Sequence, residues 1–234
     1  MNILGLIPAR SGSQELKNKN LLKINGKTLL EIALQEAKKS KYINKVFLST
    51  DSKSYKTILK KLKIENDYIR PKKLASNKAS IYDVARHAVK WFEGQNYEID
   101  YVVILQPTTP FTSDLDIDCC VDIMDSNPNL TSVFSAKIVR ERPEWMFTFN
   151  NTRDSLETYL GEIPNKEKGI SQNLEEIIIP NGGVYVTDRN ALIQEKSLIT
   201  KKTSCHIMSD IHSIDIDEPI DFIIAESILK QRKD

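Results

Sequence analysis

Two short stretches near opposite ends of the sequence contain the charged residues that phosphate chemistry requires. Near the start, the apolar run Ile3–Ile7 opens into a polar, basic loop, IPARSGSQELKNKN at residues 7–20. Near the end, SIDID at residues 213–217 places Asp215 and Asp217 two residues apart. Because basic groups bind phosphate and paired carboxylates bind divalent cations, we expect a site for a phosphorylated ligand.

The opening loop has the position and the charge of an anion site. It follows a strand-like run and precedes a helix-like segment that begins at Thr28, which is where open α/β sheets bind phosphate groups. Four basic side chains face one acidic side chain here, a local charge of +3 in a chain of net charge +1. These residues are Arg10, Lys17, Lys19, Lys23 and Glu15. The alternative is that they are simply solvated at a surface turn.

The acidic segment has the alternation of a half-buried extended chain. On such a segment Asp215 and Asp217 point to one face, while Ile214 and Ile216 point into the core. Magnesium usually takes one or two carboxylates and completes its shell with water and phosphate oxygens. The alternative is that Asp217 caps a helix beginning near Pro219. Capping alone does not call for Asp215, so we favour a Mg²⁺ site.

The composition excludes several classes of protein. With 33 basic and 32 acidic residues in 234, the chain has no global field for nucleic acid or a membrane surface. The cysteines Cys119, Cys120 and Cys205 lack metal-ligand spacing, which favours a reduced, cytoplasmic setting. There is no signal-peptide pattern and no apolar run approaching 18 residues. We therefore expect a protein that is neither secreted nor membrane-spanning.

The alternation of apolar runs with longer segments of helical period predicts an α/β fold, with a mostly parallel sheet flanked by helices. Two capping pairs, Thr28 with Glu31 and Ser80 with Asp83, mark helix starts. Strands are expected at 3–7, 46–49, 101–105, 132–138, 184–186 and 205–208. Helices are expected near 28–37, 55–62, 80–91, 114–124 and 219–230.

Residues from about 140 to 177 interrupt this pattern. Trp145, Phe147 and Phe149 suggest a hairpin, and a polar stretch follows. Such a segment fits an arm that packs on a second subunit, a lid or a mobile loop. The economical interpretation is one domain over 1–234 with an arm at about 140–177.

Six motifs together resemble one enzyme family, the acylneuraminate (CMP-sialic acid) cytidylyltransferases. They are IPARSGSQELKNKN, STDS at 49–52, RPKKLASNKAS at 70–80, LQPTTP at 105–110, PNGGVY at 180–185 and SIDID. The resemblance implies a nucleotide-diphospho-sugar-transferase-like fold that forms a homodimer through an extended arm. It also implies the transfer of CMP from CTP to the anomeric oxygen of a nonulosonic acid, of sialic, legionaminic or pseudaminic type, with release of pyrophosphate and Mg²⁺ as cofactor.

The resemblance implies roles for individual residues. The residues implied at the nucleotide are Pro8, Ala9, Arg10, Lys19, Asn20, Arg70, Ala79 and Ser80. Those implied at the sugar are Gln106, Gln172, Asn181, Gly182 and Tyr185. Asp215 and Asp217 match the magnesium carboxylates, and Arg10, Lys19 and Asp217 are the residues expected to be catalytic. The residue that takes the proton from the sugar hydroxyl is not identified.

The sequence departs from the family pattern at several positions. Gln14 and Glu15 replace a lysine and a small or basic residue, Ser171 precedes Gln172 where many members have arginine, and Thr112 likewise replaces an arginine. One alternative is CMP activation of an eight-carbon ulosonic acid, or another sugar nucleotidyltransferase. The alternative of another class is a non-catalytic nucleotide-binding subunit. The presence of both the basic pair, Arg10 and Lys19, and the acidic pair, Asp215 and Asp217, argues against it.

Overall fold

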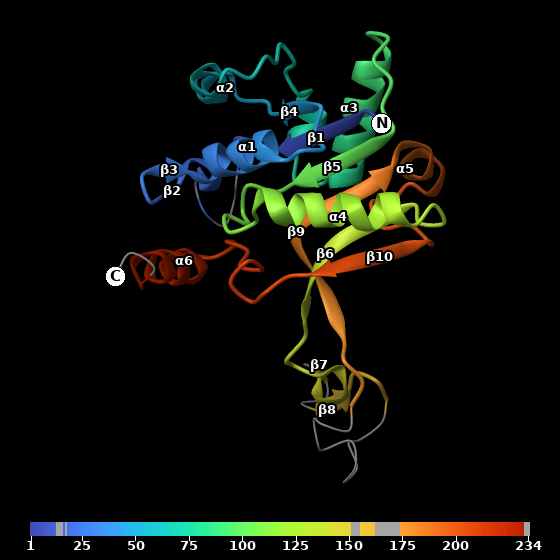
Figure 1. The fold of residues 1–234 in the computed structure, drawn as a ribbon. Coiled ribbons are helices and arrows are strands. Elements are labelled where there is room, and N and C mark those ends of the chain that lie inside the picture. Colours follow the sequence, from blue (N-terminus) through green and yellow to red (C-terminus); the bar gives the residue numbers. More distant parts are fainter. Residues whose placement is uncertain (13–15, 17, 151–154, 162–173, 232–234) are drawn as a thin grey trace. The chain divides into compact units, whose positions relative to one another are not determined.

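The computed structural model describes residues 1–12, 16, 18–150, 155–161 and 174–231, with the side chain of Asn150 excepted. The chain divides into two compact units (Figure 1). Unit 1 contains Met1–Ala136 and Pro180–Asp234, and unit 2 contains Lys137–Ile179. Each unit is described by itself below.

A six-stranded sheet forms the centre of unit 1, with the strand order β10-β6-β9-β5-β1-β4. The strands are β1 (Ile3–Pro8), β4 (Lys45–Ser49), β5 (Tyr101–Leu105), β6 (Ser132–Ile138), β9 (Ile178–Asp188) and β10 (Thr203–Ile207). Strand β1 is parallel to β4 and β5, and β10 is parallel to β6, whereas β9 is antiparallel to β5. The predicted α/β fold with a mostly parallel sheet is confirmed.

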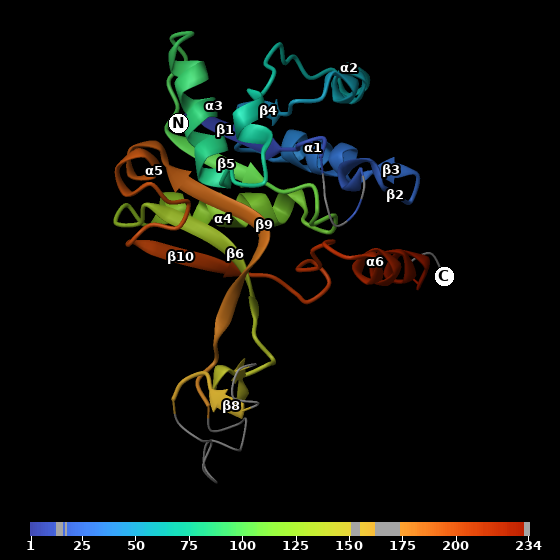
Figure 2. The same cartoon turned by 180° about the vertical axis from the view of Figure 1, so that it is seen from behind.

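Helices cover both faces of this sheet. Helices α1 (Leu29–Lys39) and α4 (Asp114–Ser126) lie on one face, and α3 (Ile81–Glu93) and α5 (Arg189–Glu195) lie on the other (Figures 1 and 2). Strand β1 supplies both cores, because Ile3 and Ile7 pack with the first pair of helices while Leu4 and Leu6 pack with the second. Burial on both faces explains the continuous apolar run that opens the sequence.

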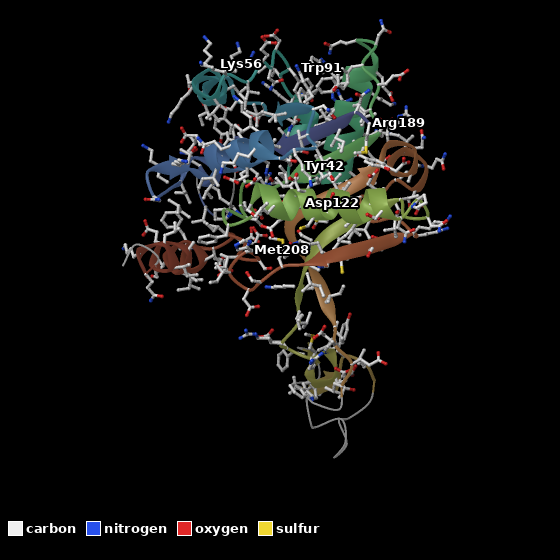
Figure 3. All side chains as sticks on the ribbon, viewed as in Figure 1. Tyr42, Lys56, Trp91, Asp122, Arg189 and Met208 are labelled. Atoms are coloured by element: carbon white, nitrogen blue, oxygen red, sulfur yellow. The ribbon has the colours of Figure 1, made fainter. Side chains whose placement is uncertain are left out.

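Side-chain contacts begin these helices and hold them together. Thr28 and Glu31 form a capping box at α1, as predicted, and Ser80 accepts from the Asp83 amide at α3. A third box, of Ser113 and Asp116, begins α4. On the face covered by α1 and α4, the hydroxyl of Tyr42, which follows α1, donates to Asp122 of α4, and Figure 3 shows the two side chains together.

Shorter elements complete unit 1. Two-residue strands β2 (Lys23–Ile24) and β3 (Lys27–Thr28) form a hairpin whose turn residues, Asn25 and Gly26, both have positive φ. The remaining helices are η1 (Lys19–Leu21), η2 (Lys53–Tyr55), α2 (Lys56–Leu62), η3 (Lys72–Ala75) and α6 (Pro219–Gln231).

A small separate core fixes the acidic segment. Ile24 and Leu29 from the start of the chain pack with Phe111, Ile216 and Ala225. Ile216 is fully buried and Ala225 belongs to α6. The isoleucine between the two aspartates therefore holds their segment beside the elements that follow the opening loop.

Unit 2 contains η4 (Pro143–Trp145) and a hairpin of β7 (Phe147–Asn150) with β8 (Ser155–Thr158). This confirms the hairpin expected from the aromatic residues. Several large apolar side chains of the unit are exposed, among them Phe149 (60%), Leu156 (64%) and Tyr159 (63%). The domain organisation, one domain with an arm at about 140–177, stays a prediction.

Two expectations from composition can be compared with the described residues. None of the helices in that part of the chain is both long and apolar enough to cross a membrane. Cys119, Cys120 and Cys205 are free thiols. Burial raises the pKa of the Cys120 thiol far above its usual range, so this side chain is a core residue rather than a nucleophile.

Candidate active site

A pocket of about 450 Å³ lies where β1 and β5 end. It is lined by Pro8, Arg10, Lys19, Asn20, Asn77, Gln106, Pro107, Thr108, Asp215 and Asp217. Seven of these ten residues are site residues that the sequence predicted, and they come from four separate segments of the chain. The carboxyl ends of parallel strands are where open α/β sheets bind ligands.

The basic loop and the acidic segment meet in this pocket. Lys19 Nζ donates to Asp217 Oδ1 at 2.7 Å, with the lysine side chain 10% exposed and the aspartate 60% exposed. The Asp221 carboxylate, not that of Asp217, accepts from the backbone N–H groups of Asp217 and Glu218 before α6. The capping role considered for Asp217 thus belongs to Asp221, and Asp217 faces the lysine instead.

Asp215 has the environment of a ligand for a cation. Its segment is not a regular strand. Ile216, between the two aspartates, is buried as predicted, and its N–H donates to the Thr108 carbonyl at 2.8 Å, whereas Ile214 is only partly buried. Within the described residues, Asp215 Oδ1 is buried without a hydrogen-bond partner. Burial is the main cause that raises the Asp215 pKa, and the charge of Asp217 raises it further, whereas the Thr108 side chain lowers it.

These two carboxylates fit a divalent cation that shares its shell with a ligand. The described residues include no cluster of three or more His, Cys, Asp or Glu side chains suited to a metal. Magnesium does not need such a cluster, since phosphate oxygens and water supply its other positions. A buried acceptor without a donor, beside a second carboxylate, is consistent with that kind of site.

Arg10 is held by contacts at both its backbone and its side chain. Asn20 Nδ2 donates to the Arg10 carbonyl at 3.0 Å, and Arg10 Nη1 donates to Asn77 Oδ1. Ala9, which is buried, donates its N–H to the Ser49 carbonyl at 2.9 Å. Two basic residues of the loop, Arg10 and Lys19, therefore line the same pocket. Gln14, Glu15 and Lys17 lie outside the described residues.

The structure places Arg70, Ala79 and Ser80 outside the residues that line this pocket. Arg70 is 4% exposed, and its Nε and Nη2 donate to the side chain and the carbonyl of Ser49. Burial lowers the Arg70 pKa to about 10. The Ser80 hydroxyl caps α3 through Asp83. These contacts support the end of β4 and the start of α3.

Two of the residues predicted for the sugar side, Gln106 and Gly182, contact each other, and Gly182 lies within strand β9. Gln106 Nε2 donates to the Gly182 carbonyl at 3.1 Å, and Gly182 has a φ of +79°. A side chain at Gly182 would place its Cβ 3.1 Å from Asp215 Oδ2. Burial, with the charge of Asp215, raises the pKa of the Tyr185 hydroxyl. Gln172 lies outside the described residues.

Asn181 is buried and acts inside the protein. Its Oδ1 accepts from Ser135 Oγ at 2.6 Å and from the Gly183 N–H at 3.1 Å. Its Nδ2 donates to Ser213 Oγ at 2.8 Å and contacts the sulfur of Met208, which Figure 3 labels. Asn181 thereby connects strand β9 to the acidic segment.

Three lining residues were not predicted. Pro107 and Thr108 lie within the LQPTTP motif and Asn77 within LASNKAS, so both motifs contained the signal. The motifs contain the loops that line this pocket, whereas the individual side chains that reach it depend on how each loop turns after its strand.

A doubly flanked α/β sheet with a basic loop after its first strand and an acidic pair facing that loop defines a nucleotidyltransferase-like protein. The family model described as cytidylyltransferase matches residues 4–160, more than half of the sequence. The chain therefore belongs to the cytidylyltransferase family, which confirms the resemblance seen in the motifs.

Curated relatives extend this result. The chain is 29% identical to the N-acylneuraminate cytidylyltransferase of Streptococcus agalactiae serotype V, over 95% of the chain and 52% of the relative. It is 27% identical to the CMP-N,N'-diacetyllegionaminic acid synthase of Legionella pneumophila, over 98% of the chain and 97% of the relative. The chain thus spans about half the length of the first relative and nearly all of the second.

Solved structures agree on the fold. A CMP:2-keto-3-deoxy-manno-octonic acid synthetase complexed with CTP superposes with a TM-score of 0.71 at 17% identity, covering 99% of this chain and 100% of that one. The 4-diphosphocytidyl-2C-methyl-D-erythritol synthase of Anaerococcus prevotii gives 0.67 at 16% identity, covering 98% and 96%. At these identities the likeness supports the fold alone.

Proposed function

We propose that this protein is a Mg²⁺-dependent cytidylyltransferase that transfers CMP from CTP to the anomeric oxygen of a nonulosonic acid and releases pyrophosphate. The acceptor is of sialic, legionaminic or pseudaminic type, in line with the names of the relatives. The observation that carries the proposal is the single pocket in which Arg10 and Lys19 face Asp215 and Asp217.

The basic residues bind the triphosphate. The sugar oxygen forms a bond to the α-phosphorus of CTP while the bond from that phosphorus to the β-bridging oxygen breaks, so negative charge increases on pyrophosphate. Arg10 and Lys19 line the pocket, where they can bind that charge. The hydrogen bond from Asn20 to the Arg10 carbonyl fixes the backbone of their loop. Lys19 is positioned in advance by its ion pair with Asp217.

Asp215 and Asp217 would hold Mg²⁺, with phosphate oxygens and water as its other ligands. When bound, the ion polarises the phosphoryl oxygens and orients them for displacement. Both carboxylates must be ionised for this role, and Asp217 already forms an ion pair with Lys19.

The sugar lies on the side of Gln106 and Tyr185. The hydrogen bond from Gln106 Nε2 to the Gly182 carbonyl fixes the orientation of the amide that lines the pocket. Gly182 leaves room for Asp215 and Gln106 to approach the backbone. Direct attack by the sugar hydroxyl requires no nucleophilic side chain, and the role of these residues is to fix its approach.

We further propose a cytoplasmic homodimer made of one nucleotidyltransferase domain over 1–234 with an arm at about 140–177. Exposed apolar side chains of unit 2, including Phe147 and Phe149, support a contact with a second copy. Sedimentation velocity at working concentration should give a dimer. A monomer there would refute this assembly without affecting the reaction.

The reaction is tested by measuring pyrophosphate release from CTP and Mg²⁺ with a panel of sialic, legionaminic, pseudaminic and eight-carbon ulosonic acids. We expect release with at least one nonulosonic acid and none with UTP, ATP or GTP. Release with the eight-carbon acid alone would replace the proposed substrate. A different result would support a non-catalytic binding subunit: CTP stabilises the folded protein against heat, but none of the acceptors leads to pyrophosphate release.

A further inference from the structure

We propose that His212 is a positioning residue, which holds the Asp215–Asp217 segment in place by donating a hydrogen bond to Asp116 of α4. The inference rests on the proposed function, because it concerns the two carboxylates assigned there to Mg²⁺. His212 itself is not among the residues that line the pocket.

Asp116 is a rigid anchor. Its Oδ2 accepts from the N–H of Ser113 at 2.8 Å, from the Ser113 hydroxyl at 2.6 Å and from His212 Nδ1 at 2.9 Å. The residue is 8% exposed and lies in the first turn of α4, where the helix dipole favours a negative charge. Burial alone would raise its pKa, but the contacts with Ser113 and His212 lower it, so the carboxylate is charged.

His212 lies in the turn that leads into the acidic segment. Its N–H donates to Ser209 Oγ at 3.3 Å, and the Ser213 N–H donates to the Ser209 carbonyl at 3.0 Å. Asp215 follows His212 by three residues. The imidazole contact therefore connects this turn to a helix residue that lies 96 positions earlier in the sequence.

The acidic segment is held at both ends. At its far end the Ile216 N–H donates to the Thr108 carbonyl at 2.8 Å. At its near end there are two side-chain contacts, from Asn181 to Ser213 and from His212 to Asp116. Removing the imidazole leaves the near end attached through Ser213, so the carboxylates can shift without unfolding of the domain.

Loss of such a supporting contact weakens a metal site by roughly 10-fold to 100-fold. We expect a change at the lower end of that range here, because the Asn181 contact remains. A second histidine serves as a control for His212, because His206 Nε2 lies 3.4 Å from the other carboxylate oxygen of Asp116. His206 belongs to β10, whose position is fixed by backbone pairing with β6.

The experiment compares the wild type with His212→Ala, His212→Asn and His206→Ala. Asparagine carries an N–H donor on the δ atom, as histidine Nδ1 does, so it can restore the bond to Asp116. Mn²⁺ affinity in the presence of CTP is measured by electron paramagnetic resonance, alongside kcat and KM. We expect His212→Ala to weaken Mn²⁺ binding by about 10-fold, His212→Asn to recover most of it, and His206→Ala to match the wild type.

The outcomes separate the two proposals. If the wild type binds Mn²⁺ with CTP and His212→Ala binds it equally well, the positioning role is overturned and the proposed function stands. An His212→Asn variant no better than His212→Ala overturns it also, because the hydrogen bond is then not what matters. Wild-type protein that binds no Mn²⁺ with CTP overturns both.

Discussion

Lys19 Nζ lies 2.7 Å from Asp217 Oδ1, and the two residues are separated by 198 positions in the sequence. The contact joins the loop after the first strand to the segment before the last helix. Since the lysine is nearly buried and the aspartate is largely exposed, Asp217 can release Lys19 to a phosphate without moving the loop. Lys19 can therefore exchange its contact with Asp217 in the free site for a contact with phosphate in the ligand-bound site.

Replacing Asp217 with asparagine should abolish turnover and leave the fold intact. The amide keeps an oxygen that can accept from Lys19 but cannot supply a charged ligand to Mg²⁺. We expect kcat to fall by at least roughly 100-fold, more than the loss of a residue that only supports a ligand. The melting temperature should hardly change, because the side chain is 60% exposed.

The matched control is Glu218→Gln, which removes the neighbouring exposed carboxylate. It should keep wild-type kcat. An active Asp217→Asn enzyme would remove the metal assignment, and equal loss in both variants would point to a general effect of charge before α6.

Much of the fold could be predicted because strong local signals agree with the tertiary structure. The strands Tyr101–Leu105 and Ser132–Ile138 have the predicted bounds, and Thr28 with Glu31 forms the predicted capping box. The helix α5 was missed, since seven residues contain too little of a helical period to be recognised. The β2–β3 hairpin was missed because its strands have two residues each.

The site could be predicted as a set of loops but not as a set of contacts. Five residues that the motifs singled out line the same pocket, namely Arg10, Lys19, Gln106, Asp215 and Asp217. Nothing in the spacing of residues indicates which side chains turn inward after a strand. Whether Arg70, Asn181 and Tyr185 touch substrate stays a prediction, and the contacts of the first two inside the protein are known only from the structure.

Asp215 should make the metal-free protein less stable as pH rises. Its folded pKa is raised above the ordinary 3.8, chiefly by burial, so the folded chain binds this proton more readily than the unfolded chain. The free energy of unfolding therefore falls as pH rises from about the ordinary value through the raised one. Asp215→Asn lacks this pH-dependent loss, so it should be more stable than the wild type at pH 7, while inactive.

Urea denaturation in a chelating buffer at several pH values measures this effect. The control is Glu218→Gln, which removes an exposed carboxylate but leaves Asp215 and Asp217 in place and should give the wild-type dependence. We expect the free energy of unfolding to fall more from acidic to neutral pH in the wild type than in Asp215→Asn. The same change in both proteins would contradict the burial argument.

Arg70 should contribute more to stability than to binding. Arg70→Met leaves the carbonyl and the hydroxyl of Ser49 without their guanidinium partner. Because hydrogen bonds to charged groups contribute about 1.5–3 kcal/mol, we expect a loss of about 2 kcal/mol in the free energy of unfolding. Arg86→Met is the control, since Arg86 is 46% exposed with Asp83 at 3.9 Å and should change stability by less than about 0.5 kcal/mol. An Arg70→Met protein of normal stability but weakened CTP binding would return Arg70 to the nucleotide site.

Gly182 and Gly26 form a matched pair that separates backbone strain from damage to the site. Both have a φ of +79°, a conformation that costs an alanine roughly 1–2 kcal/mol. An added Cβ at Gly26 meets no atom within 4 Å in the described part of the chain. At Gly182 it would lie 3.1 Å from Asp215 Oδ2 and 3.3 Å from Gln106 Nε2.

Both alanine variants should therefore lose similar stability in urea denaturation, but only one should lose activity. In Gly182→Ala the carboxylate and the amide must shift away from the new methyl group, and small displacements of positioning groups cost about 100-fold in rate. We expect kcat/KM for the sugar acid to fall by that order in Gly182→Ala and to stay near wild type in Gly26→Ala. Equal activity in the two variants would mean that the reaction does not require Asp215 and Gln106 to lie close to the backbone at Gly182.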